Sequence, residues 1–338
     1  MLVAQRRLLQ SKAFKIFNAS FFADATPPNI MLRILTYHRV AHPQDTPGLN
    51  PRTISATPHV FAEQMRLLAR KYRVVSMEEV LHAVAMRKKL PPRAVLLTFD
   101  DAYCDFGESA WPILRREKLP ATLFVPTGYP DHPERSFWWD RLHRAFCQSA
   151  QKRIMLAPVG ELELHSPPAL HESLKRTQNY VKTLPHDAAL HFIDEVCLRL
   201  DGHIAPHKSV LSWSELRELN REGVTLGAHT VSHPIMTKLS TERVRLEITQ
   251  SQQDLQRELG KTLPIFCYPN GGHDEAVVAL LREEGYRLAF TTLDGQNDLS
   301  RVDPLRLRRT NLTRHTSPLL LRVRLMKWAA YVDAWRHR

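Results

Sequence analysis

Two short segments that lie far apart in the chain carry side chains able to share one metal ion. Asp100 and Asp101 end an apolar run, and His229 and His233 stand four residues apart much further downstream. An aspartate and two histidines can hold a divalent metal and leave one coordination position open for water. A second aspartate beside them can act as a general base. This set of residue types predicts a metal-dependent hydrolase.

The paired carboxylates have an ordinary alternative explanation. An aspartate that follows a strand often caps a helix, but Asp100 and Asp101 together exceed what a cap needs. Two adjacent carboxylates after a buried strand repel each other and lose solvation, and a divalent cation compensates for both costs. The pair therefore favours a metal site over a cap.

The histidine pair also has an alternative, because 17 histidines are present and most of them need no special role. Here a strand is expected directly before His229, and Pro234 directly follows His233. The spacing i, i+4 predicts that both rings lie on one side of a helical turn. The zinc-protease pattern HExxH does not apply, because position 230 is threonine and no glutamate lies between the histidines. The base must then come from elsewhere, and Asp100 is the candidate.

Short apolar runs alternate with helical patterns, which predicts a parallel sheet, either open or closed into a barrel. Asp100, His229 and Tyr268 each follow such a run directly. The strand ends of a parallel barrel all open on one face, whereas an open doubly wound sheet brings them together mostly near one switch point. Three reactive segments favour the barrel, with about seven parallel strands near residues 33–37, 74–75, 94–99, 121–125, 224–228, 265–268 and 288–292.

The regular alternation is interrupted at about residues 131–210, which we interpret as a mostly helical insertion in a barrel spanning 32–312. Residues 1–31 form a basic amphipathic N-terminal segment. Residues 313–338 form a basic amphipathic C-terminal helix, expected either to pack on the barrel exterior or to lie on an anionic membrane surface.

The composition excludes several classes of protein. A net charge of +12 can indicate nucleic-acid binding, but the basic residues form no nucleic-acid motif, so a solvated basic surface is the better interpretation. The four cysteines show no CxxC spacing, which indicates a reducing compartment. No signal peptide and no stretch of about 20 apolar residues stands out. We therefore expect a cytoplasmic protein, either free or peripheral on the inner face of the membrane.

The Asp-Asp and His-x-x-x-His-Pro segments, in this order, resemble the polysaccharide deacetylase family (carbohydrate esterase family four). Residues 98–103 (TFDDAY) resemble its first motif, with Ala102 where the family usually has glycine. Residues 229–234 (HTVSHP) resemble its second motif without departure, and residues 266–271 (FCYPNG) resemble the region of its third. Residues 35–40 and 137–142 resemble segments of longer bacterial members, so the resemblance covers about residues 32–312.

The resemblance implies a distorted (β/α) barrel that acts on N-acetylated sugar polymers. It implies that Asp101, His229 and His233 hold a divalent metal, commonly zinc, and that Asp100 is the general base. The chemistry agrees, because a metal polarises an acetamide carbonyl and lowers the pKa of its bound water. The tetrahedral oxyanion would also need a backbone N–H, which the region of Tyr268 can supply.

Two features of the family are missing. The third motif often carries an arginine that orients the base, but Cys267 and Tyr268 occupy that region here, and we interpret the cysteine as a small buried hydrophobe. The late Leu-x-His motif, which supplies the acid in the family, is not evident either. We therefore consider His38, after the first strand, as a residue that points into the site, and Arg309 as one that orients a carboxylate.

The candidate substrate-binding residues are fewer and less specific. We expect Tyr268, Pro269 and Asn270 to border the substrate. Trp138 and Trp139 can stack on sugar rings, or they can anchor the insertion as ordinary apolar residues. Asp140 beside them can act as a helix cap.

Three functions fit these residues. The first is a hydrolase that removes N-acetyl groups from amino sugars of a polysaccharide, oligosaccharide or glycolipid in envelope or exopolysaccharide synthesis. The second is a carbohydrate-binding or assembly factor with weak catalysis, suggested by the two missing features. The third is a deformylase of a lipid-linked sugar. The partner in each case is a glycan or glycolipid, with no nucleic acid, and the sequence does not give the oligomeric state.

Overall fold

The computed structural model describes residues 31–200 and 208–326. The strand β5 (Ala94–Phe99) lies in the middle of its main sheet. All six residues of β5 are buried, because helices and the barrel interior cover its two faces. The strand β1 (Met31–Tyr37) pairs with it in parallel, with Leu35 opposite Leu97. On its other side, β4 (Arg73–Val75) pairs with its first half and β6 (Thr122–Val125) with its end.

The sheet curls, and a short late segment joins its two sides. From β6 it continues through β9 (Thr225–Ala228) and β10 (Ile265–Cys267) to β11 (Leu288–Phe290). A bridge between Phe290 and Leu307, followed by the parallel pairing of β13 (Thr310–Asn311) with β1, closes the ring. The predicted distorted (β/α) barrel is therefore confirmed.

One strand of the ring was not predicted. The pair 74–75, expected as a ring strand, forms β4 on the first half of β5, and β13 closes the ring instead. Thr310 and Asn311 are polar and form only a two-residue strand, so no apolar run marks them in the sequence. The short strand β12 (Asn297–Asp298) pairs antiparallel with the start of β1.

Helices pack on the outside of the ring, and their boundaries follow from local capping. The helix α3 begins after Thr57, whose hydroxyl accepts a hydrogen bond from the backbone N–H of Val60, and α4 begins with a capping box between Ser76 and Glu79. The outer helices are α3 (Pro58–Lys71), α4 (Met77–Ala85), α5 (Trp111–Glu117), α9 (Trp213–Arg221), α10 (Thr241–Leu259) and α11 (Glu275–Glu283).

Strand side chains alternate between two apolar clusters, as the period of two requires. Leu35, Leu97 and Phe99 belong to the cluster that packs against α3 and α5, whereas Ile34 and Leu96 belong to a second cluster. Phe124, Cys267, Phe290 and Leu307 join that second cluster from the other strands of the ring. These residues fill the barrel interior, so the barrel is a packed core.

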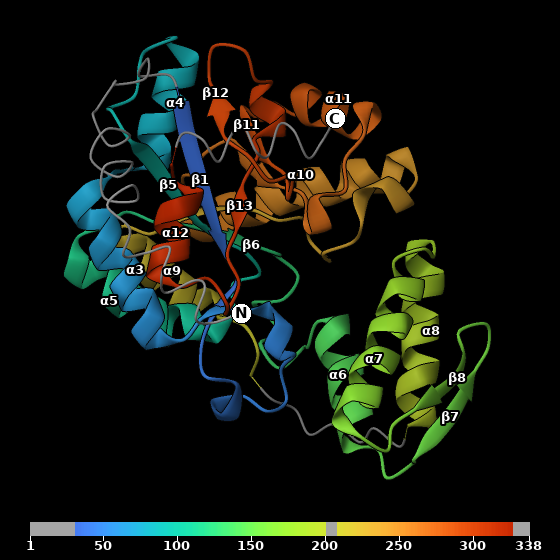
Figure 1. Cartoon of the computed structure of the whole chain (residues 1–338). Helices are drawn as coiled ribbons and strands as arrows, with labels where there is room; N and C mark the ends of the chain where they lie inside the picture. The colour runs from blue at the N-terminus through green and yellow to red at the C-terminus, as the bar shows by residue number, and fades with distance from the viewer. Residues whose placement is uncertain (1–30, 201–207, 327–338) are drawn as a thin grey trace.

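The segment between β6 and α9 holds its own apolar core, around Leu142, Phe146 and Leu162. Figure 1 shows it beside the barrel, at the lower right. It consists of α6 (Trp138–Gln148), α7 (Pro167–Val181), α8 (His186–Arg199), and a hairpin of β7 (Arg153–Leu156) and β8 (Gly160–Glu163). The hairpin was not predicted, although buried Ile154 and Leu156 alternate with exposed neighbours as a half-buried strand requires.

The predicted N-terminal segment lies outside the described residues, except for residue 31 in β1. Of the predicted C-terminal helix, the structure describes α12 (Pro318–Arg324), which buries Leu321 near α3 and exposes Leu319. Among the helices of the described ranges, none is long and apolar enough to cross a membrane. The remaining short elements are β2 (Arg39–Val40), β3 (Ile54–Ala56), the π-helix Phe106–Ala110, and 3-10 turns at Pro43–Asp45, Pro51–Thr53, Met236–Lys238, Pro269–Gly271 and Pro304–Arg306.

Candidate metal and catalytic site

The candidate site lies at the carboxyl ends of neighbouring strands. His38 follows β1, Asp100 follows β5, His229 follows β9, and Cys267 is the last residue of β10. Thr36 of β1 pairs with Thr98 of β5. Side chains two residues apart on a strand point to the same face, so His38 and Asp100 are the next inward positions after these threonines. The barrel interior therefore changes from apolar to hydroxyl to ionisable side chains toward this face.

A tight turn directs the two carboxylates. The φ angles of Asp101 and Ala102 are 73° and 52°, which lie in the left-handed region. Glycine adopts this region without strain, which explains why a motif with this turn favours glycine at the position that Ala102 occupies here. The amide of Asp100 still donates to the carbonyl of Tyr37, which holds this residue in the strand ladder.

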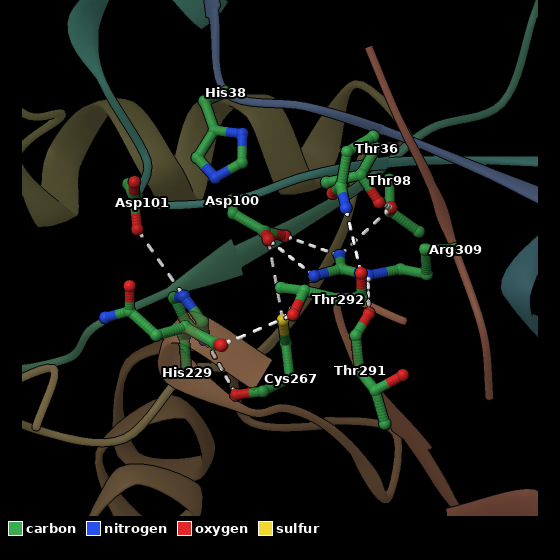
Figure 2. Close-up of polar contacts among 12 residues, drawn as sticks. Thr36, His38, Thr98, Asp100, Asp101, His229, Cys267, Thr291, Thr292 and Arg309 are labelled. Atoms are coloured by element: carbon green, nitrogen blue, oxygen red, sulfur yellow. Dashed lines mark hydrogen bonds and ion pairs between the residues drawn. The ribbon is translucent and has the colours of Figure 1, made fainter. Parts of the chain in front are cut away.

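The predicted metal ligands lie together and are buried. The Oδ1 atom of Asp101 lies 3.4 Å from Nε2 of His229 and 3.2 Å from Nε2 of His233. One ligand atom of each residue lies within 4.8 Å of the others, so a single ion can contact all three. Figure 2 shows Asp101 directed at the His229 ring.

The polar atoms of these residues fit a divalent metal. The Oδ1 atom of Asp101 is buried and has no hydrogen-bond partner, which is costly unless a cation is nearby. The Nδ1 atom of His229 lies 2.7 Å from the carbonyl oxygen of Cys267. Donation from Nδ1–H to this carbonyl leaves the lone pair of Nε2 facing Asp101, as a metal-binding histidine requires.

The two histidines do not lie on a helical turn, so that prediction is wrong. Residues 229–233 form an irregular loop in which Thr230 and His233 have φ angles of 65° and 58°. Glu247 of α10 fixes this loop, because its carboxylate accepts hydrogen bonds from the backbone N–H groups of Val231 and Ser232, at 2.8 and 2.9 Å. Glu247 was not predicted, because its only signal in the sequence is a charge near the apolar stripe of α10.

Asp100 forms a buried ion pair with Arg309. The guanidinium donates to both carboxylate oxygens, with N···O distances of 2.8 and 2.7 Å (Figure 2). It also donates to the carbonyl of Thr291 at 2.8 Å, which fixes its orientation. Burial alone would raise the pKa of Asp100, but the charge and hydrogen bonds of Arg309 outweigh it, and the net pKa is lowered. Asp100 is therefore an oriented, ionised carboxylate.

Cys267 packs against this ion pair. Its Sγ atom lies 3.6 Å from Asp100 Oδ2 and 3.1 Å from a guanidinium nitrogen of Arg309. Burial raises the pKa of its thiol, in agreement with the interpretation as a small buried group. Cys267, Asp100 and His229 form a second cluster of ligand types. This cluster suits a metal less well, because both oxygens of Asp100 already bond to Arg309.

The remaining catalytic candidate, His38, is half-buried beside the aspartates, as Figure 2 shows. Its backbone N–H donates to the hydroxyl of Ser55 at 2.9 Å. The structure thus brings together all six predicted metal-binding and catalytic residues, which are His38, Asp100, Asp101, His229, His233 and Arg309.

Comparison with known proteins identifies the family. The model of the polysaccharide deacetylase family matches residues 87–289. The chain belongs to this family. YxkH of Bacillus subtilis is 18% identical over 265 residues, which are 78% of this chain and 65% of that protein. The poly-beta-1,6-N-acetyl-D-glucosamine N-deacetylase of Escherichia coli K12 is 22% identical over 291 residues, which are 85% of this chain and 37% of that enzyme.

The chain also resembles solved structures of the family. The deacetylase PplD of Streptococcus pyogenes, solved with acetate, superposes with a TM-score of 0.59 and 22% identity. The alignment covers 89% of this chain and 100% of that one. The fold is therefore shared, although the chain spans less than two thirds of the length of the two curated relatives named above.

The predicted substrate residues of the third motif lie differently from expectation. Tyr268 is fully buried, and its phenol donates to the carbonyl of Leu305 at 2.8 Å. Its backbone N–H donates to the carbonyl of Phe290, so this N–H is already used within the sheet. Pro269 is buried as well, and only Asn270 is exposed. The residue types of this motif did not reveal that hydrogen bonds within the protein already use the phenol and the backbone N–H of Tyr268.

Trp138 and Trp139, expected either to stack on sugar rings or to anchor the insertion, have different surroundings. Trp138 is half-buried and lines a groove next to His233. Trp139 is buried, its ring lies 5.0 Å from that of His233, and its Nε1–H donates to the hydroxyl of Tyr103 at 2.7 Å. Trp138 can therefore stack on a sugar ring, whereas Trp139 packs against the ring of His233.

A buried network around Asp140 was also missed. Its carboxylate accepts hydrogen bonds from the Tyr103 hydroxyl at 2.8 Å and from the backbone N–H of Asn50 at 2.6 Å. Asp140 therefore links α6 to two barrel loops, and the expectation that it caps a helix is wrong, because Phe137 occupies the cap position. Burial raises the pKa of this carboxyl to about 6.

We expect Arg309→Gln to lower the free energy of unfolding by about 3–5 kcal/mol, because it leaves the buried Asp100 carboxylate unpaired. Adding Asp100→Asn should restore part of this loss, since the second change removes the unpaired charge. Urea unfolding of the metal-free variants measures both effects. Arg115→Gln, which breaks an exposed ion pair with Glu222, is the matched control and should cost at most about 1 kcal/mol. Strictly additive losses in the double variant would contradict the pairing.

The second prediction concerns the pH dependence of stability at Asp140. Its carboxyl binds a proton near pH 6 when folded but only near pH 3.8 when unfolded. The folded state therefore gains stability as the pH falls from 7 to 4.5, and this gain is lost as the pH rises through 6. Relative to Asp140→Asn, the wild type should gain about 2 kcal/mol over this interval in urea unfolding. An unchanged difference at the two pH values would contradict the raised pKa.

Proposed function

We propose that this chain is a metal-dependent hydrolase that removes N-acetyl groups from amino sugars of a glycan or glycolipid. One observation carries the proposal: the buried Asp101, His229 and His233 set lies beside Asp100, whose two oxygens are held by Arg309. The name of the Escherichia coli relative, an N-deacetylase of an N-acetylglucosamine polymer, supports the same substrate class.

Asp101, His229 and His233 are the residues that would hold the metal, and a nitrogen and oxygen donor set of this kind suits zinc. A bound divalent metal supplies Lewis-acid polarisation of the acetamide carbonyl and makes a water molecule more acidic. The hydrogen bond between His229 and the Cys267 carbonyl keeps the ring in the orientation that binding requires.

Asp100 takes the proton from the attacking water. Arg309 supports this role in two ways, because it keeps the carboxylate ionised and fixes the direction of both oxygens. An arginine from a distant segment thereby does what the missing third-motif arginine does in relatives. This arrangement weakens the alternative of a binding factor with weak catalysis, which the missing arginine had suggested.

His38 donates a proton to the nitrogen of the leaving amine. It lies beside Asp100 at the neighbouring inward position, and the sequence carries no late Leu-x-His motif to supply another acid. Water adds to the carbonyl carbon, the C–N bond breaks, and the products are acetate and the free amino sugar. The cellular role in envelope or exopolysaccharide synthesis, and a location in the cytoplasm or at the inner face of the membrane, remain part of this proposal.

Acetate release from N-acetylated oligosaccharides by the zinc-loaded protein tests the activity directly. We expect Asp100→Asn to reduce the rate by about 10²–10⁴-fold, with zinc content unchanged. Glu78→Gln, at an exposed carboxylate of α4, is the matched control and should retain full activity. Glycan binding that survives Asp100→Asn, with no acetate from the wild type, would instead favour the binding factor.

His38→Gln tests the proton donor, and a choice of substrates separates a catalytic from a structural role. We expect acetate release from an N-acetyl sugar to fall by about 10²–10⁴-fold, because the amine leaves poorly without a proton. Hydrolysis of 4-nitrophenyl acetate should change little, since nitrophenolate leaves without protonation. Equal losses on both substrates would show that His38 only maintains the structure.

A further inference from the structure

A groove opens beside the metal ligand His233, between the insertion and the barrel loops. Its walls come from α6 and the loop before it, from the end of α7 through α8, and from the loop that follows the second histidine. Trp138, Leu190 and Ile235 form apolar parts of the wall. A substrate whose acetamide group reaches the metal ligands extends into this groove, because His233 belongs to both.

The ionisable residues that line the groove are unbalanced in charge. Arg135, Arg141 and Lys238 line it together with the titratable rings of His186 and His233, and no aspartate or glutamate is among the lining residues. Arg141 is paired with Asp194 of α8. Arg135 lies over the ring of Tyr129, at 5.0 Å. Within residues 31–200 and 208–326, neither Arg135 nor Lys238 has a carboxylate partner.

This charge bears on which substrate fits. Deacetylation turns a neutral acetamide into an ammonium, so a polymer that has lost several acetyl groups carries positive charge along its length. Unpaired Arg135 and Lys238 repel such a polymer, whereas they attract an anionic group close to the acetamido sugar. The apolar wall with Trp138 suits the face of a sugar ring.

We propose that the substrate is an acetamido sugar that carries an anionic group, a phosphate or a carboxylate, on the sugar itself or on its neighbour. Arg135 and Lys238 bind this group, and Trp138 packs on the sugar that bears it. The inference rests on the proposed function and deepens it, because it names the substrate class and two residues that select it.

Three disaccharides test whether a phosphate or a carboxylate is the anionic group that the groove binds. The first is a neutral N-acetylglucosamine disaccharide, the second is its 1-phosphate, and the third has glucuronate next to N-acetylglucosamine. For the zinc-loaded protein we expect kcat/KM to be about tenfold higher for at least one anionic disaccharide than for the neutral one. The advantage should shrink in 0.5 M salt, where charges on the surface are screened.

The double variant Arg135→Gln/Lys238→Gln should lose this advantage and keep the wild-type value for the neutral disaccharide. Arg66→Gln/Lys71→Gln removes one arginine and one lysine from the exposed side of α3, away from the groove (Figure 1), and should change neither value. The anionic disaccharide that gains identifies phosphate or carboxylate as the preferred group.

Equal kcat/KM values for all three disaccharides, or equal losses on all of them in the double variant, would overturn this inference and leave the deacetylase function standing. Absence of acetate from every substrate would count against the function itself. In that case calorimetric titration of the same disaccharides decides the inference, because equal Kd values for the neutral and anionic forms overturn it.

Discussion

The burial of two adjacent carboxylates at the end of β5 is the constraint on which the rest of the site depends. Asp100 and Asp101 are almost fully buried, and a buried carboxylate is costly unless a cation or hydrogen bonds compensate. The chain supplies different compensation for each. Arg309 pairs with Asp100, whereas Oδ1 of Asp101 faces the two imidazoles and can share a metal ion with them. The neighbouring aspartates therefore have different electrostatic environments.

The same ion pair connects the site to the closure of the barrel. Arg309 lies between Leu307, which bridges to β11, and β13, which pairs with β1. The segment that joins the last strand of the ring to the first therefore also carries the guanidinium that pairs with Asp100. A change that opens the ring there would leave Asp100 unpaired, so barrel closure and the charge state of Asp100 are coupled.

The insertion adds a further set of contacts around the candidate site. In its first helix, Trp138 lines the groove and Trp139 packs against the ring of His233. Asp140 joins the same helix to Tyr103 and to the backbone of Asn50 by hydrogen bonds. The wall of the groove beside His233 is therefore held in place. In the proposed enzyme the barrel would supply the reaction, and the groove would select the substrate with Arg135 of the insertion and Lys238 of the loop after His233.

The sequence by itself determined the strands with apolar runs, the barrel, and the reactive residues at the strand ends. Hydrophobic runs and local spacing suffice for these features, because a parallel barrel places its strand ends on one face. Only the tertiary structure decided the rest: β13 as the closing strand, Asp100 as the carboxylate that Arg309 orients, Glu247 beneath the histidine loop, and the burial of Tyr268 and Trp139. Each of these depends on contacts between segments distant in the chain, and neither composition nor periodicity carries information about which distant groups meet.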